Sequence, residues 1–209
     1  MYENLKGKSI SFEGGEGTGK STLIKNLVEV LTKENLNLVS TREPGGAKIS
    51  EQIREVIVDK NNVDMCYQTE ALLFAASRAQ FISQVINPSL KENKTILIDR
   101  FVDSSLVYQG IGRGLGIDEV MRINQFATNG WLPDLTIVLD IDPKIGLKRI
   151  SDNNRDTNRL DEQDLEFYNL VRNGYLELAK KYPKRIIVID ADRTSNEILD
   201  EVLHILKTL

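Results

Sequence analysis

Cysteine and histidine are almost absent from this 209-residue chain. Cys66 is the single cysteine, so no intrachain disulfide can form, and a reducing compartment, the cytoplasm, is expected. Because Cys66 lies in a polar connecting segment, it is a poor candidate for a catalytic thiol. The single histidine, His204, lies among leucines and isoleucines of a C-terminal helical pattern, which favours a structural role over acid-base catalysis.

Long apolar runs and an excess of basic charge are missing as well. No run is apolar for long enough to span a bilayer, and the N-terminus lacks a signal-peptide core, so no membrane partner is expected. The formal net charge is −4 and the sequence pI is about 5.2, which argues against general binding of nucleic acid. An acidic chain that handles phosphates must gather its arginines locally, so the arginine positions are informative.

The chain also lacks internal repeats, low-complexity tracts and linkers, which predicts one domain over residues 1–209. Strand patterns recur over residues 8–13, 36–41, 95–99, 135–141 and 185–190, and helical patterns lie between them. This alternation predicts an α/β fold with a doubly wound sheet of five parallel strands. In such a sheet, ligands bind beyond the carboxyl ends of the strands.

One stretch near the N-terminus carries the clearest chemical signal. Residues 10–22 combine a strand, a glycine-rich turn and the start of a helix, and Gly14, Gly19, Lys20 and Ser21 match the pattern G-x-x-x-x-G-K-[ST]. Glycines let backbone N–H groups converge on phosphate oxygens, and the helix N-terminus adds partial positive charge. Lys20 can reach the β- and γ-phosphates, and the Ser21 hydroxyl can ligate Mg²⁺. This P-loop predicts nucleotide binding without identifying the reaction.

Two charged residues stand together at the end of a second strand. Asp99 closes an apolar strand, where a carboxylate can hold Mg²⁺ directly or through water. Arg100 follows it, and a guanidinium there suits a reaction that spreads charge over a transferring phosphoryl group. The structural alternatives are an aspartate that only ends a strand and an arginine in a surface ion pair.

The helical pattern over residues 69–87 has two distinct faces. A core stripe is predicted for Leu72, Ala75, Ala76, Ala79, Ile82 and Ile86. Phe74 and Arg78 lie four residues apart on the opposite face, where they could stack on and hydrogen-bond a nucleobase. Phe81 and Val85 share that side, so a subunit interface remains an equal explanation for part of it.

Residues 148–160 are polar and poor in apolar anchors, which predicts an exposed mobile loop between two helices. A solvated run of charge is the default interpretation. Arg149, Arg155 and Arg159 nevertheless bracket the segment at the sheet edge where phosphates are expected. We therefore expect a lid at about residues 149–161 that excludes water and brings arginines to the developing charge.

Taken together, these motifs resemble the thymidylate kinase (dTMP kinase) family over essentially the whole chain. The matching segments are 12–14 with 17–22, 42–46, 70–78, Asp99-Arg100 with Ser104, Tyr108-Gln109 and 158–161. The resemblance implies the three-layer α/β/α P-loop kinase fold, a homodimer, and phosphorylation of dTMP to dTDP by ATP·Mg²⁺ for dTTP synthesis. The non-core face of the helix over 69–87 is a plausible part of the dimer contact.

Other P-loop functions remain as alternatives to this reading. A second deoxynucleotide kinase, or a deoxynucleoside kinase, would share the fold and differ in its acceptor. A switch GTPase would require N-K-x-D and D-x-x-G motifs, and neither is found, since Asn93-Lys94 is followed by Thr95-Ile96.

The resemblance also implies roles for individual residues. ATP would be bound by Gly14, Gly15, Glu16, Gly17, Thr18, Gly19, Lys20, Ser21 and Thr22. Adenine would pack between Arg149 and the loop of Asp192 and Arg193. Mg²⁺ would be held by Ser21 and Asp99. The catalytic cations would be Lys20, Arg100, Arg155 and Arg159.

The implied dTMP site draws on several elements. Its residues would be Glu16, Arg42, Arg54, Phe74, Arg78, Arg100, Ser105 and Gln109. Phe74 would stack on thymine, while Arg78 and Gln109 would hydrogen-bond its polar edge and Ser105 would lie close to the base. Glu16 would lie near the sugar 3′-hydroxyl. Arg42 and Arg54 would hold the dTMP phosphate, and Arg100 would bridge the donor and acceptor phosphates.

The family divides by the source of its catalytic arginine. Some members carry arginine inside the P-loop at the position of Gly17, whereas others, mostly bacterial, keep glycine there and place arginines in the lid. Gly17 with Arg155 and Arg159 makes this chain similar to the second group. Phe101 stands where the family often has tyrosine, and Val107 where alanine is frequent; both bear only on fine substrate selectivity.

Overall fold

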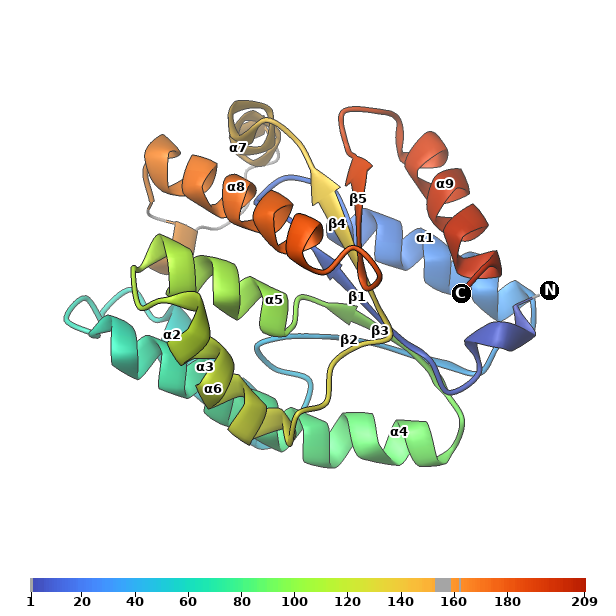
Figure 1. Ribbon diagram of the computed structural model, residues 1–209, viewed down its shortest axis with the longest axis horizontal. Helices are drawn as coiled ribbons and strands as arrows, with labels where there is room; N and C mark the ends of the chain where they lie inside the picture. Colours follow the sequence, from blue (N-terminus) through green and yellow to red (C-terminus); the bar gives the residue numbers. More distant parts are fainter. Residues whose placement is uncertain (1, 153–158, 162) are drawn as a thin grey trace.

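The computed structural model describes residues 2–152, 159–161 and 163–209. Within these residues, parallel strands form one five-stranded sheet in the order β2-β3-β1-β4-β5 (Figure 1). The strands are β1 (Ser9–Glu13), β2 (Leu38–Arg42), β3 (Thr95–Asp99), β4 (Leu135–Asp140) and β5 (Ile186–Asp190). The predicted doubly wound parallel sheet is therefore confirmed, with strand ends within two residues of the expected positions.

Helices cover both faces of the sheet and complete the predicted three layers. One face is covered by α1 (Lys20–Lys33) and α9 (Ser195–Lys207) (Figure 1). The other face is covered by η2 (Ile82–Ile86), α5 (Val102–Ser105), η3 (Leu106–Gly112) and α8 (Leu165–Lys181). Each helix buries an apolar stripe that would be costly to leave in water.

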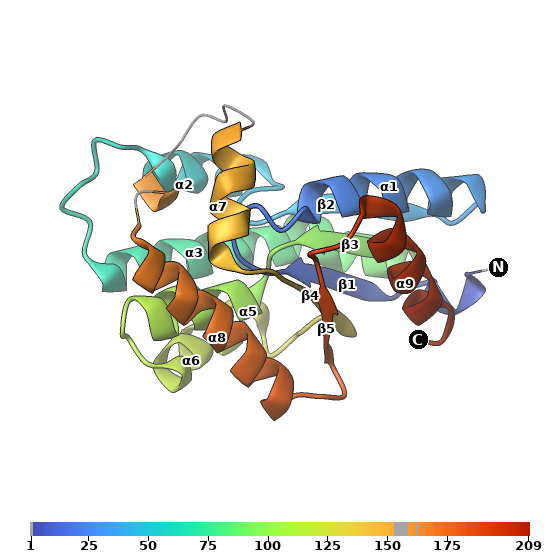
Figure 2. The ribbon, with the colours of Figure 1, turned by 90° about the horizontal axis from the view of Figure 1, so that it is seen from above.

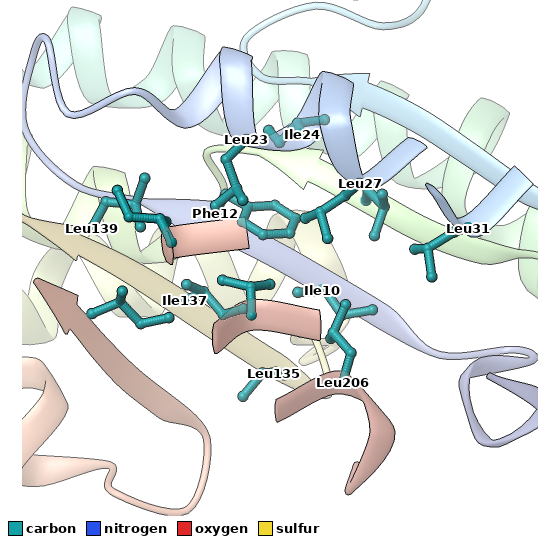
Figure 3. Packing of buried hydrophobic residues seen from close by; sticks show 14 of the residues in the cluster. Ile10, Phe12, Leu23, Ile24, Leu27, Leu31, Leu135, Ile137, Leu139 and Leu206 are labelled. Atoms are coloured by element: carbon teal, nitrogen blue, oxygen red, sulfur yellow. The ribbon is translucent and has the colours of Figure 1, made fainter. Parts of the chain in front are cut away.

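Strand alternation assigns each buried side chain to one of the two cores. In β4, Leu135 and Ile137 face the core under α1 and α9, whereas Val138 faces the core under α8. Leu27 of α1 packs in the same core as Ile10 and Phe12 of β1 (Figure 3). Because both faces are covered, the strands are apolar on both sides, as parallel strands require.

Seven further helical segments complete the described structure. They are η1 (Glu3–Leu5), α2 (Lys48–Val58), α3 (Tyr67–Phe81), α4 (Asn87–Lys91), α6 (Ile117–Thr128), α7 (Pro143–Asp152) and η4 (Arg159–Asp161). Helix α3 packs between α2 and α6, and α7 lies beside the loop that joins β1 to α1 (Figure 2). Among the residues with assigned structure, no helix has the length and apolarity needed to cross a membrane.

The predicted core stripe of the helix over 69–87 is partly wrong. Ala75, Ile82 and Ile86 are buried, but Leu72 is 56 % exposed, and Ala76 and Ala79 are exposed as well. The helix carries small apolar residues on both sides, so periodicity did not distinguish the faces. In addition, the π-helical turn η2 ends α3 after Phe81 and changes the phase of the side chains.

The predicted loop over 148–160 also begins later than expected. Helix α7 continues to Asp152, so Arg149 lies on a helix rather than in a loop. Residues 153–158, and with them Arg155, lie outside the described residues. On the other side of this gap, Arg159 lies in the short helix η4.

The central packing predicts a large effect for one strand residue. Ile137 is fully buried in β4, so Ile137→Ala should lower the free energy of unfolding by about 3 kcal/mol through lost burial and a residual cavity. Chemical denaturation measures this change. Val63→Ala is the control, because Val63 is 82 % exposed, and its effect should stay within about 0.5 kcal/mol. Equal effects of the two variants would contradict this account of the core.

Candidate functional site

Two cavities lie at the carboxyl ends of the strands, where ligands were expected. The central cavity has a volume of about 400 Å³ and runs from the P-loop, residues 14–22, towards α3 and η3. The outer cavity has a volume of about 430 Å³ and lies between the P-loop, α7 and the start of α9. Both are lined by Gly17, Thr18, Gly19 and Thr22. The P-loop thus separates two spaces that are each large enough for a small molecule.

The P-loop wraps around the ammonium group of Lys20. Gly14, Gly17 and Gly19 have φ angles of +131°, +68° and +91°, which side-chain-bearing residues rarely adopt. Lys20 Nζ donates hydrogen bonds to the carbonyl oxygens of Gly15 at 2.8 Å and Gly14 at 3.1 Å. Burial, with a smaller contribution from the Arg100 guanidinium, lowers the pKa of Lys20 to about 8. An anionic ligand beside Lys20 would favour its charged form.

Helix α7 approaches the P-loop so closely that no side chain fits between them. A Cβ on Gly17 would lie 2.1 Å from the carbonyl oxygen of Gly146, and a Cβ on Gly146 would lie 2.2 Å from that of Glu16. Both clashes are with backbone, which cannot move aside as a flexible side chain can. This contact explains why glycine occupies position 17.

Ser21 and Asp99 come together although they are distant in the sequence. The Ser21 hydroxyl, in the first turn of α1, donates to a carboxylate oxygen of Asp99 at 3.2 Å. Among the described residues, no three histidine, cysteine, aspartate or glutamate side chains are grouped so that they could bind a metal ion by themselves. A cation between Ser21 and Asp99 would therefore complete its coordination with ligand oxygens and water.

Arg100 points from the end of β3 into the central cavity. Its φ of +68° is unusual for a residue with a side chain, and its backbone N–H donates to Phe12. The guanidinium donates to Glu16 at 2.8 Å and to the carbonyl oxygen of Gly14 at 3.1 Å. Tyr108 supports the same pair, because its hydroxyl donates to Glu16 at 3.1 Å.

The buried carboxyl group of Glu13 stabilises the turn that follows β3 and contains Arg100. Its oxygens accept hydrogen bonds from the Phe101 N–H at 2.7 Å, the Tyr175 hydroxyl at 3.0 Å and the Ser104 hydroxyl. Burial, and next the charge of Asp103, raise the pKa of Glu13 to about 7. The sequence alone indicates no role for Glu13, since an acidic residue at the end of a strand is a common feature.

Arg42 and Arg54 also line the central cavity. Both donate to the carbonyl oxygen of Pro44, at 2.8 Å and 3.2 Å, so the two guanidinium groups converge. Arg42 also forms an ion pair of 3.0 Å with Glu51. Two converging guanidinium groups can bind the oxygens of one phosphate group in a bidentate manner.

The four residues expected at a base, Phe74, Arg78, Ser105 and Gln109, all line the same cavity. Arg78 differs from expectation, because it is only 1 % exposed. Its five N–H donors match five contacts, which involve Glu43 twice, the Phe101 carbonyl, Ser105 and Asn124. A ligand atom that binds Arg78 would have to replace one of these partners.

Burial of Glu43 raises its pKa to about 7, with the paired Arg78 opposing this shift. Its Oε1 is the only buried side-chain polar atom without a hydrogen-bond partner in the described part of the chain. The pair therefore fixes Arg78 at the cost of one unsatisfied oxygen.

The residues expected at adenine lie around the outer cavity. Arg149 and Arg193 line it, and Arg149 donates to the Ala191 carbonyl at 3.3 Å. Asp192 is not a lining residue, but its carboxylate lies 3.6 Å from Arg149. Thr194 and Ser195, at the start of α9, line the cavity and were not predicted.

Arg159, which was expected in a lid, is not brought to the P-loop in this structure. Arg159 donates to the carbonyl oxygen of Ile57 at 2.8 Å and forms a 2.7 Å ion pair with Glu70. It thus binds α2 and α3 on the far side of the central cavity. Arg155 lies in the segment that has no described coordinates.

Glu70 and Arg113 also line the central cavity, and no sequence motif predicted a role for them. Glu70 accepts from Gln109, Arg113 and Arg159, and Arg113 also packs on the ring of Phe167. The helical spacing could have predicted that Glu70 lies near the site, because residues 70, 74 and 78 are four apart and share one face of α3.

Comparison with known proteins gives one consistent result. A family model described as thymidylate kinase matches residues 12–202. The thymidylate kinase of Clostridium novyi (strain NT) is 53 % identical over 203 residues, which cover 97 % of this chain and 99 % of that protein. That of Bacillus velezensis is 48 % identical, with 97 % and 96 % covered. The crystal structure of thymidylate kinase from Ehrlichia chaffeensis matches with a TM-score of 0.78 and 32 % identity, covering 95 % of this chain and 98 % of that one.

The contact between α7 and the P-loop predicts a binding defect. Gly146→Ala should displace the P-loop backbone and weaken the binding of a non-hydrolysable ATP analogue by at least about tenfold, as measured by titration calorimetry. Lys144→Ala is the control, because Lys144 is exposed on the same helix. Unchanged affinity in Gly146→Ala would show that the close backbone approach has no role in binding.

Proposed function

This chain belongs to the thymidylate kinase family, and we propose that the outer cavity holds ATP and the central cavity holds dTMP. Membership assigns the reaction ATP + dTMP → ADP + dTDP, which contributes to dTTP synthesis. The observation that carries the placement of the substrates is the P-loop itself, since its residues line both cavities. A phosphoryl group bound on this loop has access to an acceptor on its other side.

The donor site draws on the P-loop and the outer cavity. Backbone N–H groups of residues 14–22 and the start of α1 would bind the ATP phosphates, with Lys20 on the β- and γ-phosphates. Arg149 and Arg193 would flank adenine, and Asp192 would hold Arg149 by their 3.6 Å ion pair.

The acceptor site draws on the central cavity. Arg42 and Arg54 would bind the dTMP phosphate, because their guanidinium groups converge at Pro44. Phe74 would stack on thymine, with Gln109 and, after exchange of one partner, Arg78 at its polar edge. Ser105 would lie close to the base, and Glu16 near the 3′-hydroxyl.

Mg²⁺ is the cofactor that the donor atoms of Ser21 and Asp99 fit best. A hydroxyl and a carboxylate joined at 3.2 Å supply two hard oxygen ligands, and phosphate oxygens and water would supply the others. When bound, the ion neutralises charge on the β- and γ-phosphates.

The reaction needs no strong general base, because the acceptor is already an anionic phosphate oxygen. Catalysis then consists of positioning the reactants and neutralising charge. Arg100 would bridge the two substrates from the end of β3, and Lys20 would share the charge from the P-loop. Arg155 and Arg159 would add to them when the lid, at about residues 149–161, brings them to the phosphates; Arg159 would first have to leave Glu70.

The described surface also supports a dimer of two copies of this chain. Three adjacent helices expose large apolar side chains, namely Val56 on α2, Leu72 on α3 and Phe126 on α6. Phe126 is 92 % exposed, so a partner that covers it would bury a large apolar side chain. A second copy is the partner proposed here. The single cysteine continues to favour a reducing compartment, the cytoplasm.

Removal of either central cation should reduce the rate strongly while the fold stays intact. Arg100→Ala and Lys20→Ala should each lower kcat by about 10²–10³-fold, which is the usual loss for one group that stabilises transition-state charge. A coupled assay of ADP release measures kcat, and circular dichroism checks folding. Near-normal turnover by a folded variant would remove that residue from the proposed mechanism.

A panel of acceptors distinguishes this function from its alternatives. With ATP·Mg²⁺, dTMP should be the best substrate, dUMP a weak one because it lacks the methyl contact, and dGMP close to none. Thymidine should be a poor substrate because it offers no phosphate to Arg42 and Arg54. Turnover of thymidine without turnover of dTMP would instead indicate a deoxynucleoside kinase, and comparable rates with dGMP would contradict the pocket assignment.

A further inference from the structure

Glu70 lines the central cavity and connects side chains from three parts of the chain. It belongs to the first turn of α3 and is only 1 % exposed. Its Oε1 accepts from Gln109 Nε2 at 3.0 Å and from Arg113 Nε at 3.3 Å. Its Oε2 accepts from Arg159 Nη2 at 2.7 Å.

The charge of Glu70 decides which way the Gln109 side chain is oriented. Burial opposes ionisation, but the Gln109 amide and the Arg113 and Arg159 guanidinium groups outweigh it and hold the pKa of Glu70 below its usual value. An ionised carboxylate can only accept hydrogen bonds. The amide nitrogen of Gln109, and not its oxygen, must therefore face Glu70.

This orientation leaves the oxygen of Gln109 facing the ligand space. Gln109 lines the central cavity and is 3 % exposed. None of the described residues donates a hydrogen bond to its Oε1. If this oxygen were fully buried, it would be a buried polar atom without a partner. Among the described residues, however, Glu43 Oε1 is the only side-chain atom of that kind. The Gln109 oxygen therefore borders the open cavity as an available acceptor.

We propose that Glu70 is a positioning residue that sets the base specificity of the central cavity by fixing the Gln109 carboxamide with its oxygen towards the ligand. A base that presents a ring N–H to this oxygen, as thymine and uracil do at N3, forms a hydrogen bond. Cytosine presents an unprotonated N3 there, so two acceptors would face each other and both would lose their water. The inference rests on the proposed function, because it assumes that a pyrimidine nucleotide occupies this cavity.

Glu70 could instead serve only as an anchor for Arg113 and Arg159. The two roles differ in their dependence on the base. Loss of an anchor changes turnover of every acceptor by the same factor, whereas loss of the fixed Gln109 orientation changes the ratio between dTMP and dCMP. The ratio of the two kcat/KM values is therefore the informative quantity.

The test compares dTMP with dCMP in Glu70→Gln. The substituted amide has the same shape and can donate as well as accept, so it no longer forces the Gln109 nitrogen inward. We expect the dTMP/dCMP ratio of kcat/KM to fall by about tenfold, mostly through KM. Glu119→Gln is the matched control, because Glu119 forms an exposed pair with Arg122 on α6; its ratio should not change. An unchanged ratio in Glu70→Gln overturns the inference.

Two further variants test the route through Gln109. In a Gln109→Met background, adding Glu70→Gln should not change the ratio further, since the oriented amide is gone. Arg159→Ala should lower turnover of dTMP and dCMP by the same factor. A change of ratio in Arg159→Ala as large as in Glu70→Gln, or an undiminished Glu70 effect without Gln109, would overturn the proposed route.

The exchange variant Glu70→Gln with Gln109→Glu covers the case in which Glu70→Gln alone does not fold. It keeps one amide and one carboxylate facing each other and still presents an acceptor to the ligand, so the preference for dTMP over dCMP should persist. Its loss would overturn the inference. Calorimetric titration with dTMP and dCMP gives the same comparison without turnover. If the unaltered protein does not use dTMP at all, the proposed function fails, which is distinct from failure of Glu70 alone.

Discussion

The buried carboxyl group of Glu13 is the constraint on which the rest of the site depends. It lies at the junction of three elements, because it ends β1 and accepts hydrogen bonds from the turn after β3 and from Tyr175 of α8. The same turn holds Arg100 in an unusual left-handed conformation. Without acceptors for the Phe101 N–H and the two hydroxyls, this turn would leave several buried donors unpaired. One carboxyl group thus fixes the P-loop, Arg100 and α8 relative to one another.

Carboxylates also explain how an acidic chain can present a cationic cavity. Arg100 pairs with Glu16, Arg78 with Glu43, and Arg42 with Glu51. Each pair holds a guanidinium in place before a ligand binds, and it limits mutual repulsion between the arginines. The binding site is therefore a set of oriented pairs rather than a patch of excess charge, so the net charge of −4 is compatible with anionic ligands.

Local patterns predicted much of this structure. The P-loop, the parallel strands and the charged residues at their carboxyl ends follow from motif spacing and alternation, because those features depend on neighbours in sequence. Contacts between distant residues did not follow in the same way. The four partners of Arg78 lie on loops after β2 and β3 and on α5 and α6, so they depend on how these elements pack against α3. The contact of Arg159 with Glu70 depends in the same way on the packing of η4 against α3. The exposed side of Leu72 could not be predicted, because α3 carries small residues on both sides. Glu70 was overlooked because its function lies in orienting another side chain.

The backbone contact between Gly17 and Gly146 has a consequence for the sequences that this fold can accept. A Cβ on Gly17 would lie 2.1 Å from the carbonyl oxygen of Gly146, and Gly17 also has a left-handed φ of +68°. A side chain at position 17 therefore requires α7 to move away from the P-loop. Position 17 and the placement of α7 are coupled in this way, so the loop can gain a side chain there only together with a change in α7.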